Sequence, residues 1–255
     1  MPSPIGAPYP ADVSTVPAPA KLTVTLRVIG VRSDGHHLID AEMVSLDLHD
    51  TVEITDGDGL EVVGAAAGSV DAGGGNLVDR ALELCGRRAA VRLHKRIPAG
   101  AGLGGGSSDA AAVLRWAGWT DVAGAASIGA DVPFCLVGGR ARVTGVGEVV
   151  EPLPFELRTY TLLTPPFGCS TPAVYAAWDR LGGPVGDHGN DLEPAAMEVE
   201  PELARWRDRL GDATGRRPRL AGSGSTWFVE GDHPGDGRVV VRTVEAEKSG
   251  SGPGG

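Results

Sequence analysis

The chain has 255 residues and a formal net charge of −10, which is enough length to bury a sizeable core in one large domain or two small ones. The acidic balance excludes nonspecific binding to nucleic acid or to a membrane surface, because no basic stripe offsets it, although a local site could still bind phosphate. Cys85, Cys135 and Cys169 are widely spaced and form no CxxC pair. This number and spacing of cysteines predicts reduced thiols in a cytoplasmic protein, without a disulfide framework or a zinc site.

Both ends of the chain are predicted to be disordered. Residues 1–16 are rich in proline and lack the charged and apolar regions of a signal peptide. Residues 247–255 consist largely of glycine, serine and proline. Because no apolar run is long enough to span a bilayer, we expect no membrane partner and a cytoplasmic location.

Strand-like and helical patterns alternate between these ends. Strands are predicted at 21–30, in two runs within 37–55, and at 59–64, 89–98, 140–151, 158–165, 218–231 and 238–247. Helices are predicted at 76–87, with Asn76 as N-cap, from Ser107 onward, with serine and aspartate suited to the cap, and at 171–182 and 201–211. The mixed, hairpin-like strands favour an α+β fold over a doubly wound sheet, with helices on one side of mostly antiparallel sheets. A turn rich in proline after residue 150 predicts a boundary between domains at 17–152 and 153–246.

A glycine-rich loop, "PAGAGLGGGSSDAAAVL" from Pro98 to Leu114, lies between a predicted strand and a predicted helix. In that context backbone N–H groups and the positive end of the helix form an anion site, so the loop predicts phosphate binding. It is not a Walker A motif, because Ser107 follows the last glycine where a lysine is required. It is not a dinucleotide-binding motif either, because no acidic residue that would bind the ribose follows at the right distance. The alternative is a flexible surface loop before a capped helix.

Together with four other segments, this loop resembles the GHMP kinase family. "PAPAKLTVTLRVIGVRSDGHHLI" at 17–39, "IGADVPF" at 128–134, "GNDLEP" at 189–194 and "LAGSGSTWF" at 220–228 are similar, in that order, to the branch that phosphorylates a cytidine diphosphate-linked sugar alcohol in non-mevalonate isoprenoid biosynthesis. The resemblance covers about Pro19 to Val229. It implies a two-domain fold with an N-terminal domain like ribosomal protein S5 domain 2 and a C-terminal ferredoxin-like domain. It also implies ATP and Mg²⁺ as cofactors and a small-molecule substrate, with no nucleic-acid partner.

The resemblance assigns the chemistry to two residues. Asp131 in "GADVP" corresponds to the general base, and Lys21 in "PAKL" corresponds to its partner. A lysine near a carboxylate keeps it ionised and supports negative charge on the substrate oxygen. From the residues alone, Asp131 could equally cap a turn before Pro133, and Lys21 could be a solvated strand lysine.

The remaining implied contacts fall to the nucleotide and to the alcohol substrate. For Asn76 the alternative is a helix cap alone, and Ser108 is a further candidate for Mg²⁺, which otherwise arrives with ATP. The implied ATP-binding residues are Asn76, Pro98, Ala99, Gly100, Ala101, Gly102, Leu103, Gly104, Gly105, Gly106, Ser107 and Ser108. The implied substrate-binding residues are Thr23, His36, His37, Thr171 and Tyr175, with the cytosine base stacked between His36 and Tyr175 and its edge bound by His37.

Three features depart from the family pattern. His36 stands where the family usually has tyrosine, Thr23 stands where it has asparagine, and the segment 114–128 is short enough to have lost a helix. Two alternatives therefore remain open. One is another small-molecule kinase of the same family, of the homoserine or mevalonate type. The other is a nucleotide-binding paralogue that has lost kinase activity. The oligomeric state is not predicted.

Overall fold

The computed structural model describes residues 13–66 and 75–247. The predicted disorder at residues 1–12 and 248–255 lies outside the described residues. Within the predicted N-terminal segment, Ser14, Thr15 and Val16 are not disordered but form the start of strand β1, where they pair with a second strand. The described helices include none that is both long and apolar enough to cross a membrane.

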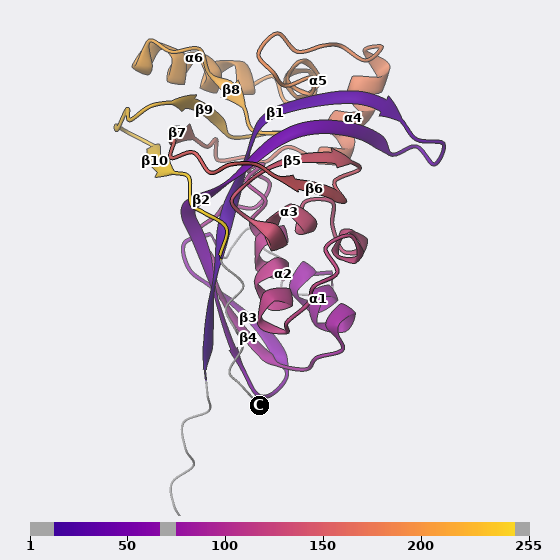
Figure 1. Cartoon of the computed structure of the whole chain (residues 1–255). Helices are drawn as coiled ribbons and strands as arrows, with labels where there is room; N and C mark the ends of the chain where they lie inside the picture. Colours follow the sequence, from indigo (N-terminus) through magenta and orange to yellow (C-terminus); the bar gives the residue numbers. More distant parts are fainter. Residues whose placement is uncertain (1–12, 67–74, 248–255) are drawn as a thin grey trace, which may run out of the picture.

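Two long antiparallel strands, β1 (Ser14–Val31) and β2 (His37–Thr55), run through the whole molecule as a curved ribbon (Figure 1). The sequence predicts two strands in 37–55, but β2 is a single strand, because β1 pairs with it along its length and its interior polar residue Asp50 is buried with partners. Register shifts mark bulges in β1, one of them between Pro19 and Lys21. A bulge changes the direction of the side chains beside it. Lys21 directly follows the first bulge, so the direction of its side chain depends on it.

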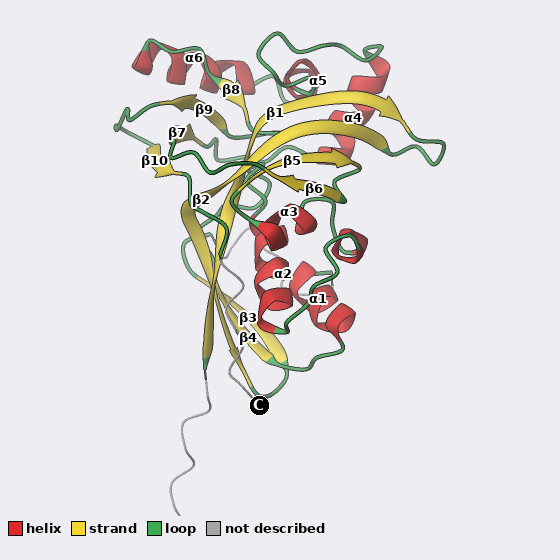
Figure 2. Ribbon diagram, viewed as in Figure 1, coloured by secondary structure: helices red, strands yellow, loops and turns green. Residues whose placement is uncertain are grey.

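The first sheet is built around this ribbon. Four further strands complete it in the order β3-β4-β2-β5-β6, with β1 paired to β2: β3 (Gly59–Val63), β4 (Ala90–His94), β5 (Arg140–Gly145) and β6 (Val149–Pro152). All pairs are antiparallel except β3 with β4. Helices α1 (Leu77–Cys85), α2 (Gly105–Trp116) and α3 (Val132–Val137) lie together on one side of the ribbon (Figure 2). A short 3-10 helix, Gly124–Ser127, lies in the shortened segment after α2.

A second sheet, with strand order β10-β7-β9-β8, is entirely antiparallel. Its strands are β7 (Thr159–Leu163), β8 (Arg219–Leu220), β9 (Trp227–Glu230) and β10 (Arg238–Arg242), and its helices are α4 (Thr171–Arg180), α5 (Glu193–Val199) and α6 (Leu203–Thr214). Helix α5, like α3 of the first half, was not predicted from the sequence. The predicted α+β class is confirmed, since both sheets are mostly antiparallel and carry helices.

The hydrophobic core is shared between the two sheets. Leu22 and Leu46 of the ribbon pack in one apolar cluster with Tyr160, Leu162 and Phe228 of the second sheet. The first sheet ends at β6 and the second begins at β7, so the change of sheet falls near residue 153. The domain boundary at 152/153 stays a prediction, because both apolar clusters draw residues from each side of it.

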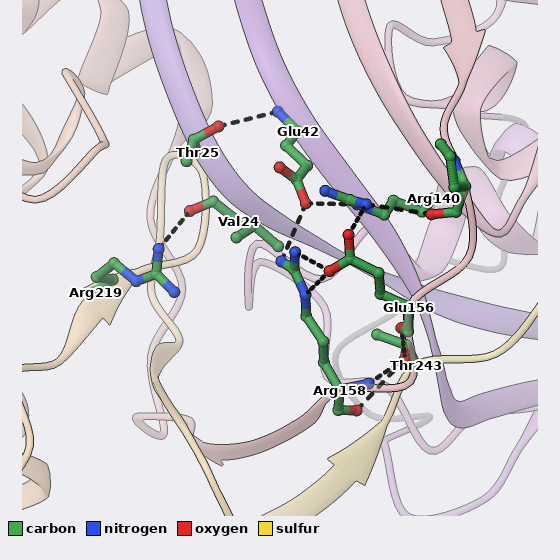
Figure 3. Close-up of polar contacts among 9 residues, drawn as sticks. Val24, Thr25, Glu42, Arg140, Glu156, Arg158, Arg219 and Thr243 are labelled. Carbon is green, nitrogen blue, oxygen red and sulfur yellow. Dashed lines mark hydrogen bonds and ion pairs between the residues drawn. The ribbon is translucent and has the colours of Figure 1, made fainter.

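Charged side chains join the two sheets where they meet (Figure 3). Glu42 of β2 accepts hydrogen bonds from Arg140 at 2.9 Å and from Arg158 at 3.2 Å, and both arginines also bind Glu156. Glu42, Arg140, Glu156 and Arg158 are called the junction network below. The Oγ1 of Thr243, just after β10, accepts a hydrogen bond from the backbone N–H of Arg158 at 2.8 Å. This contact fixes the end of the second sheet beside the junction network.

Candidate functional site

A cavity of about 450 Å³ opens beside the glycine-rich loop. Its walls come from β1, the start of α1, the segment after β4, the loop and start of α2, the segment before α3, the start of α4 and the segment after β8. The lining residues are Lys21, Gly75, Asn76, Leu77, Lys95, Ile97, Pro98, Ala99, Gly100, Ala101, Gly102, Leu103, Gly104, Gly105, Gly106, Ser107, Asp109, Asp131, Thr171 and Ser223. The structure therefore brings together most of the residues implied for catalysis and nucleotide binding.

The glycine-rich loop lies directly on the ribbon. Gly104 has a φ of +65°, and a Cβ added there would lie 2.6 Å from Cγ of Lys21. The backbone N–H of Lys21 donates to the carbonyl of Leu103 at 2.9 Å. A side chain at position 104 would therefore both strain the backbone and displace the lysine.

A second glycine loop, residues 221–225, packs against the first. A Cβ on Gly102 would lie 2.5 Å from the carbonyl oxygen of Ala221, and the N–H of Thr226 donates to the carbonyl of Ala101 at 3.0 Å. Asn190 of the "GNDLEP" segment is buried and donates to the carbonyls of Leu220 and Gly222. This motif holds the second loop in place.

Lys21 and Asp131 form an ion pair at the cavity wall, with Nζ 3.2 Å from Oδ2. Lys21 is buried, whereas 33% of the Asp131 side chain is exposed. Asp131 precedes α3 but its side chain makes no capping hydrogen bond, so the alternative of a turn cap before Pro133 does not hold. The lysine also donates to Oγ1 of Thr23 at 3.1 Å. Thr23 is buried, outside the lining of the cavity, and contacts the lysine.

The serines after the glycines differ in their surroundings. Ser107 lines the cavity, but Ser108 is fully buried and its hydroxyl donates to the carbonyl of Pro19 at 2.6 Å. The prediction of Ser108 as a ligand of phosphate or Mg²⁺ is therefore wrong for this geometry. Helix α2 begins at Gly105 and has Gly104 at its N-cap without a side-chain hydrogen bond, so the predicted serine or aspartate cap is also wrong.

Asn76 lies where both the helix-cap role and the nucleotide-binding role require it to be. Its Oδ1 accepts a hydrogen bond from the N–H of Val78 at 2.9 Å, which confirms the helix cap. The same residue lines the cavity, as the nucleotide role requires. Thr171 and Ser223 lie on the cavity wall contributed by the second half of the chain, with their hydroxyls 2.8 Å apart.

The residues implied for the cytosine base lie near the tip of the ribbon. The ring of His37 lies against Tyr175, with centroids 4.6 Å apart, and edge-on to Trp178, while its Nε2 is 2.8 Å from Asp179. His36 is largely exposed, and its Nδ1 lies 3.2 Å from Asp34. Burial raises the pKa of the Tyr175 hydroxyl, and the charge of Asp131 adds to this shift. In this structure His37, and not His36, is the histidine stacked on Tyr175.

Sequence reasoning missed a group of three buried charges at the cavity. Lys95, after β4, binds Asp50 of β2 and lies 2.7 Å from Asp109 of α2, and all three side chains are at most 2% exposed. Asp50 also accepts the N–H groups of Arg96 at 2.5 Å and Ile97 at 2.9 Å. Asp50, Lys95 and Asp109 are called the buried trio below. A lysine at the end of a strand just before the loop was the only signal in the sequence.

Known proteins resemble this chain over most of its length. The family model "GHMP kinases N terminal domain" matches residues 76–139. The 4-diphosphocytidyl-2-C-methyl-D-erythritol kinase of Paracoccus denitrificans is 40% identical over 83% of this chain and 84% of its own length. The enzyme of the same name from Pelotomaculum thermopropionicum is 39% identical over 85% of this chain and 88% of its own length. This chain belongs to the 4-diphosphocytidyl-2-C-methyl-D-erythritol kinase family.

Solved structures place this family member in the expected fold. A crystal structure of 4-(cytidine 5'-diphospho)-2C-methyl-D-erythritol kinase is 31% identical, with a TM-score of 0.71 over 90% of this chain and 99% of that one. The homoserine kinase of Cytophaga hutchinsonii, 17% identical with a TM-score of 0.59, covers 96% of this chain and 99% of its own. A likeness at that identity shows the fold alone. The GHMP kinase fold predicted from the sequence is confirmed.

Proposed function

We propose that this chain transfers the γ-phosphoryl group of ATP to the C2 hydroxyl of 4-diphosphocytidyl-2-C-methyl-D-erythritol. The observation that carries the proposal is the Lys21–Asp131 ion pair on the wall of a cavity formed by the glycine-rich loop, in a chain of this kinase family. Phosphoryl transfer needs a cradle for the triphosphate, a group that accepts the proton of the alcohol, and positive charge near the transferred group. The glycine-rich loop, Asp131 and Lys21 are the proposed sources of these three parts.

The cavity fits a nucleoside triphosphate. Its volume is within the range of about 300–1,000 Å³ that is typical of small-molecule sites. Backbone N–H groups of the glycine-rich loop and the start of α2 favour phosphate there, and Ser107 offers a hydroxyl. Among the residues that the structure describes, no cluster of His, Cys, Asp or Glu could hold a metal by itself. Mg²⁺ would therefore be held by the ATP phosphates and water, its usual binding mode, and would neutralise phosphate charge when bound.

Asp131 is the proposed general base. Its carboxylate accepts the proton of the C2 hydroxyl as the oxygen attacks the γ-phosphorus, and the bond between that phosphorus and the oxygen leaving with ADP breaks. Lys21 is held by Thr23 and Asp131 at the same place, so its ammonium supports the negative charge on the attacking oxygen. Because Lys21 is buried, water screens this charge only weakly.

The cytidine end of the acceptor is proposed to bind at the tip of the ribbon. His37 and Tyr175 present ring faces there, and stacking on an aromatic ring contributes about 1–3 kcal/mol per base. Since His37 already lies on Tyr175, the base would enter by moving this ring, with His36 on the exposed side of the turn. Thr171, whose hydroxyl lies 2.8 Å from that of Ser223 on the cavity wall, is proposed to contact the alcohol part of the substrate. A cytoplasmic location and the lack of a nucleic-acid partner are part of this proposal.

Replacement of the base tests the mechanism most directly. Asp131→Ala should lower kcat by roughly 10²–10⁴-fold, since a positioned general base contributes about that factor. The measurement is a coupled assay of ADP release at saturating ATP and acceptor. Asp58→Asn is the control, because Asp58 is an exposed carboxylate paired with Arg88 outside the cavity lining. A kcat of Asp131→Ala equal to that of the control would remove Asp131 from this role.

The choice of acceptor needs a second assay. Wild-type protein is given ATP with 4-diphosphocytidyl-2-C-methyl-D-erythritol, homoserine or mevalonate in parallel, and ADP release is followed. We expect turnover with the first acceptor alone. Turnover with either of the others would indicate a sibling kinase, and turnover with none would indicate a paralogue that has lost kinase activity.

A further inference from the structure

The buried trio is a second group of charges at the cavity, apart from Lys21 and Asp131. Lys95 and Asp109 both line the cavity, and Asp50 lies behind them. Asp50 is satisfied from three sides, by the N–H groups of Arg96 and Ile97 and by Lys95. The trio is therefore a fixed element of the cavity wall.

One atom of the trio has no partner. Oδ2 of Asp109 accepts a hydrogen bond from Nζ of Lys95 at 2.7 Å, whereas Oδ1 is buried and is unpartnered among the described residues. The whole side chain is only 2% exposed. A buried carboxylate oxygen without a donor is costly, so the site is complete only when a further group or a proton reaches Oδ1.

The trio carries more negative than positive charge. Two carboxylates face one ammonium, in a wall where the proposed function requires a polyanion to bind. Burial raises the pKa of the Asp109 carboxyl to about 7; Lys95 opposes this shift and Asp50 adds to it. A single proton on Asp109 makes the trio neutral.

The other elements packed against α2 bring few further charges to Asp109. β1 contributes Lys21, and the segment before α3 contributes Asp131, which are paired with each other. α3 contributes the buried thiol of Cys135, whose pKa burial raises to about 12, so that it is neutral. The ionisable residues of α1 are Asp79, Arg80, Glu83 and Cys85, while the residues that this helix buries are Val78 and Ala81.

We infer that Asp109 takes up a proton when ATP binds: the proton lies on the buried Oδ1 and neutralises the carboxyl in the wall that faces the phosphates, while Oδ2 keeps Lys95 in place. This inference rests on the proposed function for the presence of a nucleotide. Protonation removes the repulsion between the Asp109 carboxylate and the phosphates. Nucleotide affinity is then linked to pH through this residue.

The direction of the linkage follows from the two protonation states. Because the nucleotide-bound protein holds a proton that the free protein loses above pH 7, affinity is greatest below pH 7 and falls as the pH rises. The expected decrease is about tenfold per pH unit above 7. Asp109→Asn carries a permanent N–H donor of the same shape with no charge, so its affinity should not change over this range.

Titration calorimetry of the whole protein with Mg²⁺ and a non-hydrolysable ATP analogue at pH 8 tests the inference. The titration is repeated in two buffers with different ionisation enthalpies, which counts the protons taken up on binding. Wild type should take up a large part of one proton and Asp109→Asn close to none, because the raised pKa leaves Asp109 mostly ionised at pH 8 before binding. Glu193→Gln is the matched control, because Glu193 is also a buried carboxylate with an unpartnered oxygen and a pKa raised by burial, but lies outside this cavity. It should behave as wild type.

The outcomes are separable. Binding by wild type without proton uptake, or equal uptake by wild type and Asp109→Asn, would overturn the inference and leave the proposed function standing. A lack of any binding by wild type would overturn the proposed function and this inference together. If Asp109→Asn does not fold, proton uptake by wild type is compared with uptake by Glu193→Gln. Equal uptake supports the inference, whereas an uptake that disappears in Glu193→Gln would assign the proton to Glu193.

Discussion

The buried trio and the junction network are both built from carboxylates and cations, yet their surroundings differ. In the trio, two carboxylates share one lysine and no side chain is more than 2% exposed. In the junction network, two arginines face two glutamates, and the exposed fractions run from 15% for Arg140 to 46% for Glu156. The trio has one more negative than positive charge and almost no contact with solvent. The junction network has equal numbers of positive and negative charges and is partly exposed to solvent.

This difference indicates different roles. Removing one partner from a buried group leaves a charge that water cannot reach, whereas an exposed pair loses little because water replaces the partner. The junction network therefore contributes mainly to how the two sheets fit together. An unbalanced charge is retained in the cavity wall at a cost in stability, which is typical of functional sites.

The largest expected effect is in the trio. Lys95→Met keeps the length of the side chain but leaves Asp50 and Asp109 buried without a cation, and should lower the free energy of unfolding by about 3–5 kcal/mol. Urea denaturation followed by tryptophan fluorescence measures it. Adding Asp109→Asn to Lys95→Met should recover part of the loss, because one buried charge is removed. Loss below 1 kcal/mol, or no recovery in the double variant, would show that the trio is hydrated.

A smaller effect is expected at the junction network. Glu42→Gln removes the carboxylate shared by Arg140 and Arg158, while Glu156 still binds both, so the free energy of unfolding should fall by about 1 kcal/mol or less. The same denaturation, repeated at high salt, should show a smaller difference from wild type, because salt screens partly exposed charges. A loss as large as that of Lys95→Met would remove the distinction between the two groups.

The smallest effect is expected at a surface pair. Arg142 and Asp40 form a hydrogen-bonded ion pair between β5 and β2, with about half of the arginine side chain exposed. Arg142→Ala should leave the Tm unchanged within the error of a thermal melt, since pairs of this kind contribute little. A clear fall in Tm would mean that the exposed fraction of a side chain does not by itself predict how much a charged group stabilises this chain.

Much of the site could be predicted because its chemistry lies in contiguous motifs. The glycine-rich loop, Lys21 and Asp131 each lie in a short segment of recognisable pattern, and the structure brings them to one cavity. Their roles in catalysis remain predictions. The trio could not be found in this way, because Asp50, Lys95 and Asp109 lie on three separate elements and meet only in the folded chain.

Local patterns failed where tertiary contacts decide the outcome. Ser108 resembles a helix cap or a phosphate ligand, but packing under β1 turns its hydroxyl to Pro19. The sequence predicts two strands within 37–55, but β2 runs unbroken through its polar middle. The strand continues there because Asp47 accepts the N–H of Arg242, and Asp50 is bound by Lys95 and two backbone groups. The alternation of strands and helices was still sufficient to predict the α+β class.

The β1–β2 ribbon also has a consequence for the order of folding. Val31 pairs with His37 beside the turn, and pairing then continues outward to Ser14 and Ile54, so each new pair closes only a short additional loop. Contacts that are near in sequence form fast. The later strands β4 and β5 both pair with β2, and a bridge joins Leu46 to Thr243. We expect the first part of the chain to form a template during synthesis, onto which both sheets assemble from residues made afterwards.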